Sequence, residues 1–96
     1  MGFSIDIVAT AKENANFRTV VSTGPNAQVV LMSIPPGGEI GVETHAHVDQ
    51  VLVFVDGSGL AALDGDEARV EAGTLIHVPA GTRHNVVNDG PVDLRL

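Results

Sequence analysis

The sequence has no cysteine, tryptophan or tyrosine, and phenylalanine occurs only three times. A chain without cysteine forms no disulfide, binds no metal through thiolates and has no cysteine nucleophile. Without tryptophan and tyrosine it also lacks the flat rings on which polysaccharides and large aromatic ligands usually stack. Any ligand is therefore expected to be small.

Basic residues are also scarce, because five lysines and arginines stand against twelve aspartates and glutamates, for a net charge of -7. Such a charge repels nucleic acid and anionic lipid, and no local cluster of basic residues offsets it, so we expect neither as a partner. No apolar run is long enough to span a bilayer. The N-terminal stretch lacks a basic segment followed by an apolar one, so nothing marks the chain for export and we expect a cytoplasmic protein.

Short apolar runs separated by turn residues fill the sequence, which we expect to form one domain over residues 1–96. Asp-Gly between short apolar runs is a strong hairpin signal, and glycine, proline and asparagine mark the other boundaries. No segment shows a sustained helical period, so we predict an all-β sandwich or barrel. The predicted strands are Phe17–Val21, Gln28–Ile34, Val51–Val55, Leu60–Leu63, Ala68–Glu71, Thr74–Val78, Arg83–Asn88 and Pro91–Leu96.

The run from Val51 to Val55 is apolar at every position, whereas a strand with one exposed face alternates apolar and polar residues. Its outer face is therefore expected to be covered. The cover is either a flap formed by the chain's own N-terminus or a second copy of the chain. We predict a homodimer, with residues around Phe3–Val8 contributing to the contact.

The stretch GVETHAHVDQ, residues 41–50, holds two of the four histidines. If it forms a strand, His45 and His47 point to the same side and can share a metal ion. The amide oxygen of Gln50 is a neutral acceptor that could complete the coordination. Spacing alone does not bring the distant His84 to this pair, and a solvated or substrate-facing histidine pair is the alternative.

Two segments resemble the two motifs of the cupin family. Residues 41–57 (GVETHAHVDQVLVFVDG) resemble the first, in which His-x-His leads to an acidic or amide residue seven positions before a glycine, as Gln50 stands before Gly57. Residues 73–88 (GTLIHVPAGTRHNVVN) resemble the second, whose glycine, proline, glycine, histidine and asparagine match Gly73, Pro79, Gly81, His84 and Asn88. The resemblance is to a small single-domain cupin of the RmlC-like jelly-roll superfamily, and it implies a cupin-type β-barrel, or double-stranded β-helix.

The resemblance also implies one divalent transition metal, held by His45, His47, Gln50 and His84. The softness of these ligands leaves zinc, nickel, manganese, iron and copper as candidates. Gln50 departs from the family pattern because it occupies the usual glutamate position, and the gap between His47 and Gln50 is one residue shorter than in the commonest pattern. Three imidazoles and an amide leave the charge of the metal uncompensated, so such a site should attract an anionic or enolisable oxygen ligand.

Five further polar residues are given roles as hypotheses. Glu43 and His77 are candidate catalytic acids or bases, with a solvated rim position for Glu43 and a structural histidine for His77 as the alternatives. Arg83 and Arg95 could clamp a substrate carboxylate, with surface ion pairs as the alternative. Asn88 is expected to stabilise the turn that follows it.

The leading functional hypothesis is a metalloenzyme that acts on a small oxygenated metabolite, a keto, hydroxy or carboxylate compound, by isomerase, lyase or dioxygenase chemistry. The alternative is a non-catalytic, metal-dependent module that binds a small ligand. The resemblance further implies more strand residues beyond Leu96, supplied by a longer chain or by a partner that completes the edge of the sheet.

Overall fold

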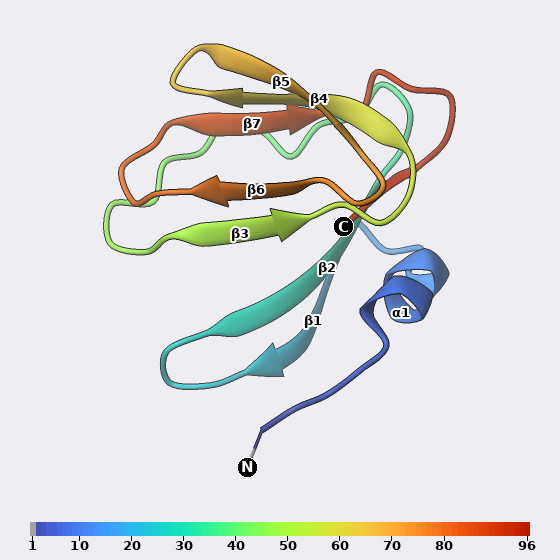
Figure 1. The fold of residues 1–96 in the computed structure, drawn as a ribbon, viewed down its shortest axis with the longest axis vertical. Helices are drawn as coiled ribbons and strands as arrows, with labels where there is room; N and C mark the ends of the chain where they lie inside the picture. Colours follow the sequence, from blue (N-terminus) through green and yellow to red (C-terminus); the bar gives the residue numbers. More distant parts are fainter. Residues whose placement is uncertain (1) are drawn as a thin grey trace.

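A computed structural model describes residues 2–96 of the chain. Over these residues the chain forms one short helix followed by eight strands, and all the named strand pairs are antiparallel (Figure 1). The elements are α1 (Ile7–Glu13), β1 (Arg18–Thr23), β2 (Gln28–Ile34), β3 (Gln50–Val53), β4 (Ser58–Leu63), β5 (Asp66–Glu71), β6 (Leu75–Val78), β7 (His84–Val87) and β8 (Leu94–Arg95).

The strands form three small sheets whose partners are often distant in sequence. β1, β2 and β8 form one sheet, β3 and β6 a second, and β5, β4 and β7 a third. Figure 1 shows β3 to β7 stacked at one end of the molecule, while the β1–β2 hairpin extends away from them beside α1. This pairing of early with late strands is the jelly-roll arrangement, so the predicted all-β cupin-type barrel is confirmed.

The core lies between the sheets and is formed by side chains from most of the strands. Phe54 and Ile34 are fully buried, and they cluster with Val70, Val86 and Leu94, each at most 1% exposed. Alternation explains the selection: in β6 every second residue is buried, and β7 repeats this pattern. The core therefore follows the period of two that the apolar runs indicate.

Asn88 is a polar residue within this core and has no exposed surface. Its side-chain nitrogen donates to the carbonyl oxygens of Ile34 and Val92, both at 2.8 Å, and its side-chain oxygen accepts from the amide of Gly90 at 2.9 Å. The bond to Gly90 confirms the predicted role in the following turn. The other two bonds join that turn to the end of β2, which spacing in the sequence does not reveal.

The short helix α1 was not predicted, because the sequence showed no sustained helical period. Asp6 caps the helix by accepting a bond from the amide of Ala9 at 3.0 Å, and Ala11 is buried against Leu31 and Val55. Seven residues make fewer than two turns, too few for a helical period to stand out. Among residues 2–96, no helix is long and apolar enough to cross a membrane.

The outer face of β3 is not covered by the N-terminus, so the flap alternative is wrong. Val51 is 61% exposed and Val53 is 41% exposed. Leu75, which pairs with Val53 across to β6, is 60% exposed. The reason is that the N-terminal residues form α1, and the buried side of α1 packs on β2 instead of on β3. An apolar strand surface is thus left open in the single chain.

Candidate metal centre

A backbone bridge between two distant segments brings Glu43 and His84 together. The amide of Glu43 donates to the carbonyl of His84, and the amide of His84 donates to the carbonyl of Glu43, both at 2.9 Å. Residues that face each other in this way across an antiparallel pair carry their side chains on the same side. The register therefore places a carboxylate beside an imidazole that lies 41 residues further along the chain.

His45 joins this pair through a second backbone contact. Its carbonyl accepts a bond from the amide of Gly81 at 2.7 Å, and Gly81 has a φ of 84°, a conformation that side chains other than glycine rarely adopt. The rings of His45 and His84 lie 5.5 Å apart, and Nε2 of His45 is 3.2 Å from Oε2 of Glu43. One ligand atom from each of the three residues lies within 4.8 Å of the others.

The tautomer of His84 is fixed by the backbone. Its Nδ1 lies 2.9 Å from the carbonyl oxygen of Thr82, which can only accept, so Nδ1 carries the proton. Nε2 then keeps its lone pair, as a neutral metal-binding imidazole requires. His84 is only 4% exposed, whereas the side chains of His45 and Glu43 are 37% and 45% exposed. The group is therefore buried at His84 and accessible to solvent at His45 and Glu43.

The three donors fit a divalent transition metal. Ligand atoms that lie about 2.0–2.2 Å from one ion are about 3 to 4.4 Å from each other, so a small closing movement of the present arrangement is sufficient. Two imidazoles and one carboxylate are a common donor set for such ions. The group faces a groove of about 1160 Å³ that Gln50 also lines, at the first residue of β3.

The predicted ligands are therefore not all gathered. His45 and His84 meet and Gln50 lines the same groove. Residues 44–49 pair with no other strand, so the condition under which His45 and His47 would point to the same side is not met. His47 lies at a bend, is exposed, and is outside the three-residue donor group. The shared-face argument consequently no longer supports His47 as a ligand.

Glu43, predicted only as a candidate acid or base, is the residue that the structure adds to the donor group. A signal for it was present in the sequence. Glu43 lies two positions before His45, just as His45 lies two positions before His47. What the sequence could not show is that Glu43 forms the backbone bridge to His84.

His77 does not line the groove or contact the donor group. It points outward from β6, where its Nε2 lies 2.8 Å from Oδ2 of Asp49. The other oxygen of Asp49 accepts from the amide of Ala80 at 2.8 Å. The bond from Ala80 has the larger effect and the bond from His77 the next, and together they hold the pKa of the Asp49 carboxyl below its ordinary value. The pair fastens the loop before β3 to the turn after β6.

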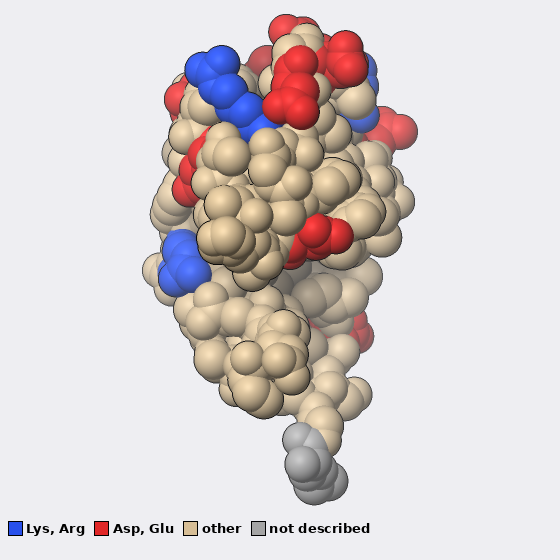
Figure 2. Space-filling model, turned by 90° about the vertical axis from the view of Figure 1, so that its left-hand side faces the viewer, with Lys and Arg blue, Asp and Glu red and all other residues tan. Residues whose placement is uncertain are grey.

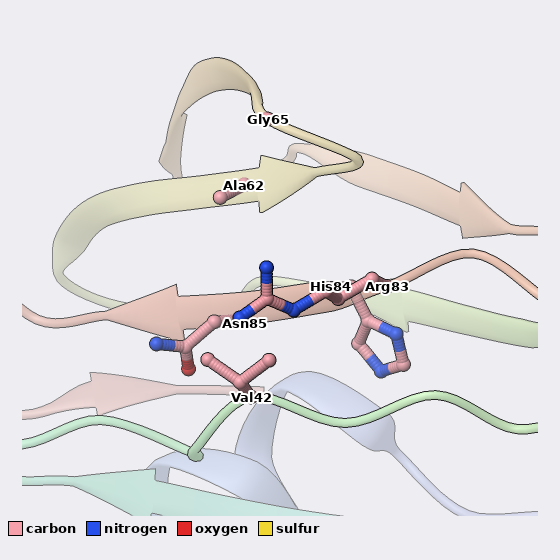
Figure 3. Close-up of a pocket in the computed structure, with 6 residues that line it drawn as sticks. All are labelled: Val42, Ala62, Gly65, Arg83, His84 and Asn85. Atoms are coloured by element: carbon pink, nitrogen blue, oxygen red, sulfur yellow. The ribbon is translucent and has the colours of Figure 1, made fainter.

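The two arginines proposed to bind substrate lie in different surroundings. Arg83 lines a small depression of about 210 Å³ together with His84, and Figure 3 shows its guanidinium turned away from the imidazole of His84. Arg95 donates to the carbonyl of Lys12 at the end of α1 and lies 3.5 Å from Asp93. Arg95 therefore helps to hold α1 against β8.

Comparison with known proteins agrees with this architecture. A family model for the cupin domain matches residues 30–96. The crystal structure of BH2720 from Bacillus halodurans superposes with a TM-score of 0.96 at 38% identity, covering 99% of this chain and 76% of that one. YrkC, an uncharacterized protein of Bacillus subtilis, is 39% identical over 100 residues, which cover 98% of this chain and 54% of YrkC.

A third relative is TcmJ, a tetracenomycin polyketide synthase protein of Streptomyces glaucescens. It is 29% identical over 65 residues, which cover 68% of this chain and 50% of TcmJ. The chain thus spans about half the length of the curated relatives YrkC and TcmJ. The family match, in contrast, extends over every strand and loop that brings Glu43, His45 and His84 together, and so this chain belongs to the cupin family.

Proposed function

We propose that this cupin binds one divalent transition metal through Glu43, His45 and His84, with Gln50 as a fourth ligand. The observation that carries the proposal is the approach of the first three donors to within 4.8 Å of one another. The protonated Nδ1 of His84 and the position of Gln50 in the same groove support it. The proposal takes residues 1–96 as one cupin domain with its metal-site motifs at 41–57 and 73–88.

A carboxylate in the donor set changes the expected electrostatics. Glu43 would supply one negative charge, so less of the metal's charge stays uncompensated than with the neutral donors that the sequence predicted. Attraction of an anionic ligand should be correspondingly weaker, although a net positive charge remains. Two histidines and one carboxylate around an ion with open positions are typical of non-haem iron(II) oxygenases, which favours iron and dioxygenase chemistry among the predicted alternatives.

The substrate class we propose is a small oxygenated metabolite with keto, hydroxy or carboxylate groups. A bound divalent metal would act as a Lewis acid on an oxygen of such a ligand. The groove beside the donor group suits a small molecule, because the lining includes apolar side chains with few charged ones. The name of the relative TcmJ refers to a polyketide synthase, and polyketides belong to this chemical class.

A non-catalytic binding module is the second candidate. Glu43 is used as a ligand in this proposal and His77 points outward. Asp49 also lines the groove, but its carboxylate is bound to His77 and to the amide of Ala80. Each acid–base side chain lining the groove among residues 2–96 therefore already has a partner or a ligand role, which suits a binding module. Incubation of metal-loaded protein with a panel of keto and hydroxy acids separates the two: product formation supports the enzyme, and saturable binding without product supports the module. A cytoplasmic location and a homodimer complete the proposal.

The metal set is tested by measuring metal content and cobalt(II) affinity of purified variants. We expect about one metal ion per chain in the unaltered protein, and a loss of affinity of more than about 100-fold in Glu43→Gln, His45→Ala and His84→Ala. The matched control is His47→Ala, which removes the same type of side chain two residues from His45. This control should keep its metal.

Two outcomes would contradict the proposed set. If His47→Ala loses metal while Glu43→Gln retains it, the ligands predicted from the sequence are correct and the carboxylate is not one of them. If none of the variants changes the affinity for cobalt, the group does not hold a metal. The cobalt absorption spectrum provides a direct check, because its intensity and position depend on the number and type of ligands.

A further inference from the structure

One basic side chain lines the groove beside the metal centre, and it belongs to Arg18 on β1. Among residues 2–96, the charged residues of the groove lining are Glu43, Asp49 and Arg18. Glu43 belongs to the donor group, and both oxygens of the Asp49 carboxylate already have hydrogen-bond partners. Figure 2 shows the hollow between the two parts of the molecule bordered mainly by uncharged residues. Apart from a bound metal, the guanidinium of Arg18 is thus the permanent positive charge that the described residues offer to a ligand in this groove.

The strand pairing turns Arg18 toward the barrel. Arg18 lies opposite Met32 of β2, and residues that face each other in an antiparallel pair carry their side chains on the same face. Met32 packs against the core cluster of the barrel, whereas the preceding residue, Leu31, clusters with Ala11 of α1. Arg18 therefore lies on the face of the β1–β2 hairpin that borders the groove, and not on the face that α1 covers.

The guanidinium of Arg18 is held in place by a neutral partner. Its Nη2 donates to Oε1 of Gln28 at 3.2 Å, and Nε2 of Gln28 donates to the hydroxyl of Thr23 at 3.1 Å. The bond to Thr23 orients the amide so that its oxygen meets Arg18. Because an amide carries no charge, it positions the guanidinium without neutralising it. Arg18 uses one of its five N–H groups in this way, and the others remain for a ligand.

The pairing of the other arginines makes this arrangement distinctive. Arg69 and Arg95 each form an ion pair with an aspartate. Among residues 2–96, no ion pair involves Arg18, although the chain has twelve acidic and only five basic residues. Arg83 has no ion pair within the same range either, but it does not line the groove. A positioned guanidinium without a carboxylate in a ligand-sized groove has the geometry that binds a carboxylate through two parallel hydrogen bonds.

We infer that Arg18 binds a carboxylate of the ligand whose other end reaches the metal. The inference rests on the proposed function and narrows its substrate class to small acids with two oxygen functions. One function, a keto, hydroxy or carboxylate group, reaches the ion at Glu43, His45 and His84, and a carboxylate at the other end reaches Arg18. The groove of about 1160 Å³ that both sites line has room for such a molecule. Contact at both ends selects one orientation of the ligand.

The inference is tested by NMR of the arginine Nε–H signals in the full chain. The probes are the straight-chain dicarboxylates from malonate to adipate, with butyrate as the reference that has a single carboxylate. The Arg18 signal is assigned by its loss in Arg18→Gln. We expect dicarboxylates to move this signal in zinc-loaded protein and, at higher concentration, in EDTA-treated protein, because a guanidinium holds a carboxylate without help from a metal.

The affinity in the zinc-loaded protein gives the second measurement. The best dicarboxylate should bind about 10-fold more tightly than butyrate, because only a dicarboxylate reaches both the metal and Arg18. Arg18→Gln should remove this advantage and leave the affinity for butyrate unchanged. Zinc content after each titration shows that the acids have not removed the metal.

Two further variants separate the contact from its charge. Gln28→Glu should also remove the advantage, since a carboxylate beside the guanidinium takes the place of the ligand. It replaces Arg18→Gln if that variant does not fold, which circular dichroism establishes. The matched control is Arg69→Gln, which removes the same charge at a residue outside the groove. This control should keep the advantage of about 10-fold.

The outcomes distinguish this inference from the proposed metal function. A folded Arg18→Gln that binds dicarboxylates as tightly as the unaltered protein overturns the inference, and so does an Arg18 signal that no acid moves in either state. Inorganic phosphate that moves the signal of EDTA-treated protein at lower concentration than any dicarboxylate overturns the assignment to a carboxylate. If the protein holds no zinc while dicarboxylates still move the Arg18 signal, the carboxylate site is supported and only the metal set is overturned.

Discussion

The two ends of the short run from Val51 to Val55 lie in opposite environments. Val51 is 61% exposed on the groove side of the molecule, whereas Phe54, three residues later, has no exposed surface. Both residues are apolar, so composition does not distinguish them. The difference arises from the neighbours: Phe54 belongs to the core cluster, whereas Val51 pairs with β6 and lines the open groove.

This contrast shows that the chain uses apolar residues for two purposes. At the packed end they form the core, where Phe54 clusters with Ala61 of β4 and Val86 of β7. On β3 they stay exposed in the single chain, at the groove that the metal centre also lines. A pattern of hydrophobic residues predicts that both sets are buried, but only the topology shows which set the chain buries by itself.

The largest effect that would test this contrast is the truncation of Phe54. Phe54→Ala should lower the free energy of unfolding by about 3–5 kcal/mol at every protein concentration, because it leaves a cavity in the core. Val51→Ala removes less buried contact in the single chain, so its cost should fall toward about 0.5 kcal/mol as the protein is diluted and the dimer dissociates. Urea unfolding followed by circular dichroism at several concentrations measures both.

An equal loss for the two variants at the lowest concentration would break the comparison. It would mean that Val51 is buried by its own chain in solution. A loss for Phe54→Ala below about 1 kcal/mol would be equally damaging, since a fully buried aromatic side chain cannot be removed from a well-packed core at so small a cost.

Two glycines extend the comparison to the backbone. A Cβ at Gly59, in β4 of the packed end, would lie 2.5 Å from the carbonyl oxygen of Val87 and 2.7 Å from Cδ2 of Leu94. Gly59→Ala should therefore cost about 1–3 kcal/mol, a fall in Tm of about 10 °C. Gly24→Ala, in the β1–β2 hairpin, meets only Ala27 at an ordinary 3.7 Å. Its effect should stay within about 0.5 kcal/mol.

Thermal unfolding of the two glycine variants at one protein concentration is the measurement. A Tm for Gly59→Ala within a degree or two of the unaltered protein would show that the Val87 carbonyl of β7 and the Leu94 side chain of β8 can move away from Gly59 without cost. Packing at that end would then be looser than the close contacts of Gly59 indicate.

Much of the fold follows from the turns in the sequence. The predicted range Gln28–Ile34 coincides with β2, and the predicted boundaries of β3 to β7 differ from the observed ones by at most two residues. Glycine and proline mark the turns because few other residues adopt those backbone angles. α1 could not be predicted, because its stability comes from a cap and from packing of Ala11 and not from a helical period.

The metal centre could be predicted only in part, for a related reason. His84 follows a tight turn that the second motif identifies, and its role as a candidate donor agrees with the structure. The choice between Glu43 and His47 beside His45 depends on which residue pairs with the backbone of β7. Such pairing is a tertiary contact. Glu43 and His47 each lie two positions from His45, so the sequence does not show which of them pairs with β7.

The smallest expected effect concerns the charged end of the molecule, which contrasts with the nearly uncharged groove. Arg69 on β5 holds both carboxylate oxygens of Asp89, at 2.5 and 3.1 Å, and this bond keeps the pKa of Asp89 below its ordinary value of 3.8. A carboxyl with a lowered pKa in the folded state adds stability above its unfolded pKa, and this contribution is lost as the pH falls through the folded pKa. In Arg69→Gln the pKa of Asp89 should rise toward 3.8, and the stability difference from the unaltered protein should be present at neutral pH and vanish in acid. Both groups are exposed, so the difference should be small.

Carboxyl NMR titration gives the pKa of Asp89 directly, with Arg83→Gln as the control that leaves Asp89 unchanged. An Asp89 pKa that is the same in Arg69→Gln and in the unaltered protein would show that the pair does not persist in solution. The charged residues at this end would then contribute nothing to stability through this ion pair.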